Sequence, residues 1–195
     1  MIDTRLVAAA LLAGAAVGGS LHRQDPPDAR QAAVLADFAV RVQSYMDFRQ
    51  SAAATVPAQT VSADPARIQR ISDALAAAIR TARAGARQGD IFAPGIAAAF
   101  RATVGSGCHQ DYVELLASVS EELDSPLSAP VVHGRWPAGV PVPTMPPDLL
   151  AALPWLPPGL QYRFINLDLV LIDIDANLIV DFVPDAIPLL TSARR

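Results

Sequence analysis

Apolar residues in the first half of the chain recur with the 3.6-residue period of an amphipathic helix. Asp or Pro residues precede most of these runs and Gly or Pro residues follow them, as is usual where helices start and stop. The predicted helices span residues 25–53, 62–85, 90–105 and 112–123. The residues expected to face the core are Val34, Phe38, Val42 and Tyr45 in the first helix, Ile68, Ile71, Leu75 and Ile79 in the second, Ile91, Phe92, Ile96 and Phe100 in the third, and Tyr112, Leu115, Leu116, Val119 and Leu123 in the fourth. Four such helices with short connections predict a small helical bundle.

A proline-rich segment follows the predicted bundle and spans residues 126–158, where the density of prolines is highest. Proline fixes φ and lacks a backbone N–H, so long helices and central strands are excluded here, although residues 148–153 can form one or two helical turns. A free linker is one interpretation of the segment. Its apolar side chains, Trp136 and Trp155 among them, favour the other interpretation, an extended strap across the bundle.

Three short runs rich in β-branched residues near the end of the chain predict strands at 161–165, 169–173 and 178–183. Asn166-Leu167-Asp168 and Asp175-Ala176-Asn177 supply the turns, and connections this short require antiparallel neighbours. Both faces of the strands are apolar, which predicts cover from the bundle or the strap. The predicted fold class is therefore α+β. It comprises a small four-helix body at 21–125, the proline-rich strap at 126–158, a three-stranded antiparallel β-meander at 159–188 and a tail at 189–195.

The first 20 residues have the features of a signal peptide. Arg5 precedes an uncharged stretch of Leu, Val, Ala and Gly residues at 6–20, which is shorter than the roughly 20 residues of a membrane span. Small residues around Gly18 allow cleavage. We therefore expect export to the periplasm or the extracellular space, with an uncleaved anchor as the alternative, and no transmembrane span in the mature chain.

Composition and charge narrow the class of protein further. Apolar residues make up 52% of the chain and charged residues 17%, which is enough apolar surface for a folded core. The net charge of −4 argues against a nucleic-acid partner, because proteins that bind nucleic acids normally carry a basic face. Cys108 is the single cysteine, so it cannot form an internal disulfide or a Cys-rich zinc site. We expect it to be a small buried residue or to form a disulfide with another molecule.

The strand residues at 162–165, 168–173 and 178–183 resemble the end of small periplasmic proteins associated with nickel and cobalt homeostasis. Together with Pro184-Asp185-Ala186-Ile187-Pro188 and Gly89-Asp90-Ile91-Phe92, the pattern is more similar to that of uncharacterised exported proteins of soil-type bacteria. The resemblance implies export and supplies no catalytic residue. The His-rich or acidic segments expected of a nickel-binding protein are missing from the sequence.

The sequence contains none of the familiar catalytic or cofactor-binding motifs that we sought. The Gly-x-Ser-x-Gly elbow of serine hydrolases, the His-Glu-x-x-His zinc motif and the phosphate-binding loop are all missing. Ser106 lies between two glycines, but in a predicted connection between helices. Cys108, His109 and Asp111 are neighbours on a predicted helix, so their side chains point in different directions. We therefore predict no catalytic residue and no cofactor, and a hydrolase ranks third among the candidate functions.

Asp173, Asp175 and Asn177 form the densest local group of oxygen ligands, at the alternate spacing that opens a calcium loop. Leu178 stands where such a loop needs Gly, and Pro184 where it needs a bidentate Glu, so a standard EF-hand is excluded. Two interpretations stay open: a weak divalent-metal site and ordinary turn formation. Further carboxylates available to such a site are Asp168, Asp181 and Asp185.

The remaining candidate binding residues are basic or aromatic. Arg80, Arg83 and Arg87 are predicted near one face of the second helix, where they either bind an anionic headgroup or carboxylate or are simply solvated. Trp136 and Trp155 could give the strap a docking surface for another protein. The leading prediction is a non-catalytic exported protein that acts by contact with an envelope protein. The alternative is a periplasmic module that binds a small ligand or a weakly held divalent metal.

Overall fold

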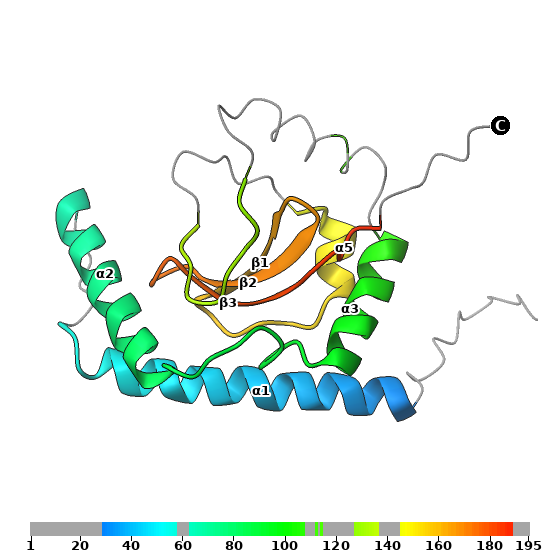
Figure 1. Ribbon diagram of the computed structural model, residues 1–195, viewed down its shortest axis with the longest axis horizontal. Coiled ribbons are helices and arrows are strands. Elements are labelled where there is room, and N and C mark those ends of the chain that lie inside the picture. The colour runs from blue at the N-terminus through cyan, green and yellow to red at the C-terminus, as the bar shows by residue number, and fades with distance from the viewer. Residues whose placement is uncertain are drawn as a thin grey trace, which may run out of the picture.

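The computed structural model describes residues 29–57, 63–107, 112, 114, 127–136 and 145–188. Its elements are α1 (Ala29–Ala53), α2 (Pro65–Ala82), α3 (Pro94–Gly107), α5 (Pro147–Ala152), β1 (Leu160–Ile165), β2 (Asp168–Asp173) and β3 (Leu178–Val183). The predicted α+β class is confirmed. α1 runs along the base of the molecule, α2 and α3 stand at its two ends, and the sheet lies between them (Figure 1). Most of the predicted fourth helix, the leader and the tail lie outside the described residues.

α1 and α2 bury the faces that the sequence predicts, with one exception. Of the predicted core residues, those buried are Phe38, Val42 and Tyr45 in α1 and Ile71, Leu75 and Ile79 in α2. The side chain of Asp64 caps α2 by accepting the N–H of Ala66 at 3.0 Å. Ile68 was expected in the core but is 52% exposed, because the first turns of α2 extend past the part of the molecule that covers Ile71. None of the described helices combines the length and the hydropathy of a membrane span.

α3 begins at Pro94, not at Asp90 as the sequence predicts. In the loop before α3, the backbone N–H groups of Gly89, Ile91 and Phe92 donate to the carboxylate of Asp181. These bonds fasten the loop to β3. The helix opens at Pro94 because proline favours the first helical position and disfavours the helical region for the residue before it, Ala93. Asp90 instead accepts the N–H of Arg87 within this loop.

α3 also continues through Gly105-Ser106-Gly107, where the sequence predicts an interruption. Glycine weakens a helix by about 1 kcal/mol relative to alanine, which is a cost that close packing can offset. A Cβ on Gly107 would lie 3.3 Å from the Leu149 side chain, so the missing side chain lets α5 approach α3 closely. Ser106 is therefore a helical residue, and its hydroxyl donates to the carbonyl of Thr103.

The three strands form the predicted antiparallel meander in the order β1-β2-β3. Asn166 and Asn177 occupy the left-handed region at φ 53° and 46°, a conformation that asparagine tolerates and that closes each turn. Ile165 pairs with Asp168 across the first turn. The register between β2 and β3 shifts at Leu171 and Ile172, which marks a bulge.

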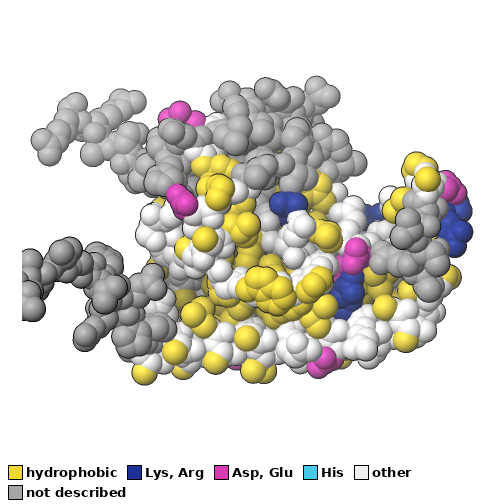
Figure 2. Space-filling model, turned by 180° about the vertical axis from the view of Figure 1, so that it is seen from behind, with side chains coloured by type: hydrophobic (Ala, Val, Ile, Leu, Met, Phe, Trp, Pro, Cys, Tyr) yellow, Lys and Arg dark blue, Asp and Glu magenta, His cyan; other side chains and the backbone are white. Residues whose placement is uncertain are grey.

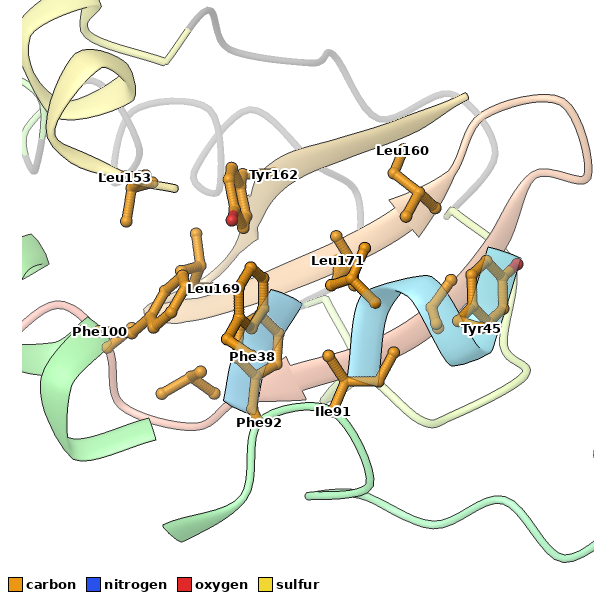
Figure 3. Close-up of a cluster of buried hydrophobic side chains, with 14 of the residues drawn as sticks. Phe38, Tyr45, Ile91, Phe92, Phe100, Leu153, Leu160, Tyr162, Leu169 and Leu171 are labelled. Atoms are coloured by element: carbon orange, nitrogen blue, oxygen red, sulfur yellow. The ribbon is translucent and has the colours of Figure 1, made fainter. Parts of the chain in front are cut away.

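The main core lies between one face of the sheet and the helices α1 and α3. Phe38, Phe92 and Phe100 form an aromatic cluster with ring centroids 4.9 to 5.7 Å apart, and Tyr162 of β1 contacts Phe100 at 5.9 Å (Figure 3). The other face of the sheet carries a smaller apolar cluster, formed by Ile165, Val170 and Ile179 and covered by Leu127, Trp136 and Phe182. Both faces of the meander are thus covered, as its apolar strands predict.

Segments from outside the sheet lie along the outer edge of β3. The N–H of His133 donates to the carbonyl of Ile179, and the N–H of Ile179 donates to the carbonyl of Gly134, both at 2.8 Å. Further along the strand, Gln88 donates its side-chain amide to the carbonyl of Phe182. The proline-rich segment at 131–136 and the loop at 88–92 together cover this edge.

Candidate functional site

A groove with a volume of about 540 Å³ lies beside β1, which is the other outer strand of the sheet. Its walls come from α5, from the segment that joins α5 to β1, and from the first half of β1. The apolar lining includes Leu150, Leu153, Trp155, Leu156, Leu160 and Tyr162. Figure 3 shows Leu153, Tyr162 and Leu160 following one another along this side of the core.

Prolines and hydrogen bonds fix the segment between α5 and β1. Pro154 follows the last helical hydrogen bond, from Leu153 to Leu149, and its missing N–H prevents the helix from continuing. The carbonyl of Pro154 accepts the hydroxyl of Tyr162 at 3.1 Å, and the carbonyl of Pro157 accepts the N–H of Leu160 at 3.2 Å. The wall of the groove is therefore fastened to β1 at two points.

Trp155 projects from this wall into solvent, and 82% of its surface is exposed. Leu153 is buried and Leu156 half-buried, so the residues on either side anchor the segment to the core while Trp155 points away. Exposed hydrophobic side chains occur elsewhere too, as the yellow areas of Figure 2 show. The other large hydrophobic residues that are exposed are Val40, Phe48, Ile68, Val131, Leu150 and Ile174. Of these, Leu150 shares the groove with Trp155, which makes the groove a place where exposed apolar groups coincide with a concave surface.

Arg163 is the one charged side chain among the described residues that line the groove. Its guanidinium donates to the side-chain oxygen of Gln161, a neutral group, and no acidic side chain among the described residues pairs with it. Burial raises the pKa of Tyr162, so its hydroxyl stays protonated and continues to donate to Pro154. The groove thus offers an apolar floor and one positive charge.

The three predicted metal ligands lie near one another but have other partners. The groups that donate to the fully buried carboxylate of Asp173 are the Tyr45 hydroxyl at 2.8 Å, Arg49 Nε at 2.7 Å and the N–H groups of Asp175 and Ala176 at 3.1 and 3.0 Å. Asp175 binds Arg49 as well, and Asn177 accepts the N–H of Trp136. Among the described residues, no three His, Cys, Asp or Glu side chains are grouped to hold a metal ion. These contacts instead fasten the β2–β3 turn to α1.

Tyr45 and Arg49 complete this cluster from α1. Burial raises the pKa of Tyr45, and the neighbouring negative charge of Asp173 raises it further, so the hydroxyl remains a donor. Arg49 is partly buried and neutralises Asp173. Because the carboxylate is fully buried, the ion pair with Arg49 and the three other donors compensate for the loss of its hydration.

Arg80, Arg83 and Arg87 do not share one binding face. Arg80 donates two hydrogen bonds to the carbonyl of His133, at 3.1 and 3.0 Å, and so fastens the proline-rich segment to α2. The side chain of Arg83 is 8% exposed and lies over the ring of Tyr45, 5.1 Å from its centroid. Arg87 is exposed. The predicted basic surface on the second helix is therefore divided among three different environments.

Two buried nitrogens near the proline-rich segment have no hydrogen-bond partner within the described structure, Nη1 of Arg83 and Nε2 of His133. Desolvation lowers the pKa of His133, and the positive charges of Arg83 and Arg80 lower it further. Asp90 acts in the opposite direction. His133 is therefore held in its neutral form where the segment meets α2 and β3.

Asp181 is the structural residue whose importance the sequence reasoning missed. It is fully buried in β3 and binds the loop before α3, as described above. Burial raises the pKa of Asp181, while the N–H donors of Gly89, Phe92 and Ile91 act against that rise. The sequence does contain a signal for this role, since Asp181 is a single acidic residue within an apolar strand. A carboxylate buried in such a strand needs hydrogen-bond donors from the rest of the protein.

No protein-family model matches this chain, and no curated protein or solved structure is similar to it. The resemblance to exported bacterial proteins therefore stays a prediction. Cys108, His109 and Asp111 lie outside the described residues, as does the predicted leader. Trp136, which the sequence groups with Trp155, is half-buried against the outer face of the sheet.

Proposed function

We propose that this chain is an exported, non-catalytic protein that binds another envelope protein through the groove beside β1. The exposed side chain of Trp155 at this apolar groove is the observation that carries the proposal. Tryptophan is enriched among the residues that dominate binding energy, because its large apolar ring is rigid and its N–H finds a partner in the interface. A groove provides the pocket in which such residues are desolvated.

The chemistry of the groove supports binding over catalysis. Arg163 contributes a guanidinium group, which donates hydrogen bonds and has no acceptor. Tyr162 stays protonated because burial raises its pKa, and its hydroxyl is already bound to Pro154. Neither group is suited to exchange a proton near neutral pH, whereas both suit a site that holds an apolar segment with one acidic group.

Export places the proposed partner in the envelope, and the predicted leader at 1–20 is the basis for this part of the proposal. Mass spectrometry of the protein recovered from the envelope fraction tests it directly. We expect a first residue close to position 20, with the leader removed. Recovery of the full-length chain from the cytoplasm would contradict export and leave the groove to be tested against cytoplasmic partners.

The groove itself is tested by photocrosslinking followed by a binding measurement. A photoreactive phenylalanine analogue replaces Trp155 in one chain and Phe48 in a matched chain, because Phe48 is an exposed aromatic residue outside the groove. We expect one discrete adduct from position 155 and none from position 48. The crosslinked protein is then purified, and its affinity is measured for the wild type and for Trp155→Ala and Phe48→Ala.

A Trp at the centre of an interface contributes about 2 kcal/mol or more, so Trp155→Ala should weaken binding by about 30-fold. Phe48→Ala should leave the affinity within about twofold of the wild type, since exposed residues outside an interface contribute little. Equal adducts from both positions, or equal affinity of both variants, would show that the groove is not the interface.

The alternative function, a weak divalent-metal site at Asp173, Asp175 and Asn177, would require a cation to displace Arg49 from two carboxylates. We expect that millimolar calcium, nickel or zinc leaves the melting temperature unchanged. A rise of several degrees that is lost in Asp175→Asn would favour the metal-binding function instead.

A further inference from the structure

We infer that the groove accepts an extended segment of the partner protein, which adds to the outer edge of β1 as a fourth strand of the sheet. This inference rests on the proposed function and specifies the conformation and chemistry of the ligand. Edge strands present unpaired backbone groups and are ready templates for such pairing.

The register of the first hairpin determines which backbone groups of β1 are available. Ile165 pairs with Asp168 across a two-residue turn, and Ile174 donates its N–H to Gly159 at the other end of the hairpin. In an antiparallel pair, alternate residues direct their N–H and C=O toward the neighbouring strand. Gln161, Arg163 and Ile165 therefore pair with β2, and Leu160, Tyr162 and Phe164 direct their backbone groups outward.

The chain uses one of these outward groups itself. The N–H of Leu160 donates to Pro157, whereas the backbone groups of Tyr162 and Phe164 have no hydrogen bond outside the sheet within the described structure. Tyr162 lies in the groove, so a segment bound there would meet its N–H and C=O, which have no partner outside the sheet among the described residues. A helix could not pair with these groups, because its own backbone groups bond internally.

The lining also places the groove at the edge of the strand. Leu160 and Tyr162 point toward the core face of the sheet, and Gln161 and Arg163 point toward the other face, yet all four consecutive residues line the groove. Side chains from both faces can border one groove where it follows the strand edge. Four residues of strand span about 13 Å, which is room for a short extended segment.

The side chains indicate the chemistry of that segment. Apolar groups at alternate positions would contact Leu153, Trp155 and Leu160 on the core side of the groove. Among the described residues, the side chain of Arg163 bonds only to the neutral side chain of Gln161. It therefore favours an acidic residue of the bound segment on the side of the groove away from the core. The same molecule shows this mode of pairing at β3, where the backbone of His133 and Gly134 binds Ile179.

A pool of synthetic octapeptides tests the inference on the full mature chain. Each peptide has Glu at both ends and alternates Thr with Val, Leu, Ile or Phe. The tightest binder is then remade in two forms, one N-methylated at the apolar positions and the other at the Thr positions. In an added strand, alternate amides face β1, so one methylated form should lose affinity at least 10-fold and the other less than twofold.

Amide hydrogen exchange supplies a readout on the protein itself. Peptide binding should slow exchange of the Tyr162 amide at least 10-fold and leave the Gln161 and Arg163 amides unchanged, because the latter already bond to β2. Trp155→Ala should lower the affinity of the protein for the peptide, and Phe48→Ala should not. This difference would show that the peptide binds in the proposed groove.

Three results would overturn strand addition. The first is the absence of binding at 1 mM, roughly the weakest affinity expected of a specific peptide site. The second is equal binding of both methylated forms without protection of Tyr162. Binding that still depends on Trp155 would then preserve the proposed function, and binding that does not would contradict both. The third is a dimeric mass with Tyr162 protected before any peptide is added, because the fourth strand would then come from a second copy of the chain.

Discussion

The two outer strands of this small sheet have opposite surroundings. At β3, the proline-rich segment pairs with Ile179, and the loop at 88–92 binds both Asp181 and the carbonyl of Phe182. At β1, the N–H of Leu160 is the one outward amide with a hydrogen bond among the described residues, and the exposed Trp155 lies beside the strand. One edge is thus built into the fold, and the other borders a groove.

This difference indicates where the molecule interacts. Exposed strand edges promote unwanted pairing, so proteins usually cover them, shorten them or charge them. This chain has segments that can cover an edge and uses them at β3. No described segment pairs with the backbone of Tyr162 at the β1 edge, and this edge borders a groove with apolar groups and Arg163, which are properties of a surface that binds another molecule.

The largest expected effect comes from the covered edge, through Asp181→Asn. Two of the four N–H groups that now donate to the carboxylate would face an amide NH₂ instead. A buried donor left without an acceptor costs about 1–3 kcal/mol, so unfolding in urea should show a loss of about 3 kcal/mol. Asp185→Asn is the matched control, because Asp185 is exposed and asparagine tolerates its φ of 48°. A loss below 1 kcal/mol would mean that the loop at 88–92 is not held by Asp181.

Gly134→Ala tests the other cover of β3. A Cβ at this position would lie 2.9 Å from both the side chain and the carbonyl of Val131, so the segment would have to move. We expect a loss of about 1–3 kcal/mol in the free energy of unfolding, together with faster amide exchange at His133 and Ile179. Gly85→Ala is the control, since a Cβ on Gly85 would meet no other part of the described structure within 4 Å. Unchanged exchange at Ile179 would show that the segment adapts without releasing the strand.

Local chemistry in the sequence was sufficient to predict the sheet and part of the helices. Three apolar runs separated by turns that contain Asn predicted the meander. Asp64-Pro65 predicted the start of α2. The predicted start of α3 was wrong because Pro94 opens the helix, while Asp181, about 90 residues away, binds the loop before it. Local propensity carries no information about such a partner.

The candidate site was predictable in part, for the same reason. The two Trp residues are equally apolar in sequence, but Trp136 packs on the sheet while Trp155 is exposed, and the packing of the proline-rich segment decides between them. Arg80 and Arg83 share a helix face by spacing. Their different roles follow from the position of the His133 carbonyl and the Tyr45 ring, which belong to other elements.

His133 makes the cover of β3 sensitive to pH. Desolvation and the charges of Arg83 and Arg80 lower the pKa of His133 below its ordinary value of 6.5. The unfolded chain therefore takes up a proton at a higher pH than the folded chain does, and stability is lost as the pH falls from 6.5 through the lowered pKa. The melting temperature of the wild type should fall more between pH 7 and pH 5 than that of His133→Asn. Asparagine suits the φ of 67° at this position, and parallel pH profiles would contradict the coupling.

The smallest expected effect on stability is at the open edge. Trp155→Ala removes the largest side chain of the groove, yet 82% of that side chain is in water, so the free energy of unfolding should change by no more than about 0.5 kcal/mol. Urea unfolding of this variant beside Gly134→Ala compares the two edges directly. A near-zero change at Trp155, set against a clear loss at Gly134, would mean that the exposed Trp155 contributes little to the fold and is available to a partner. A loss of 2 kcal/mol or more would place Trp155 in the core of its own chain, and the open edge would then need a different explanation.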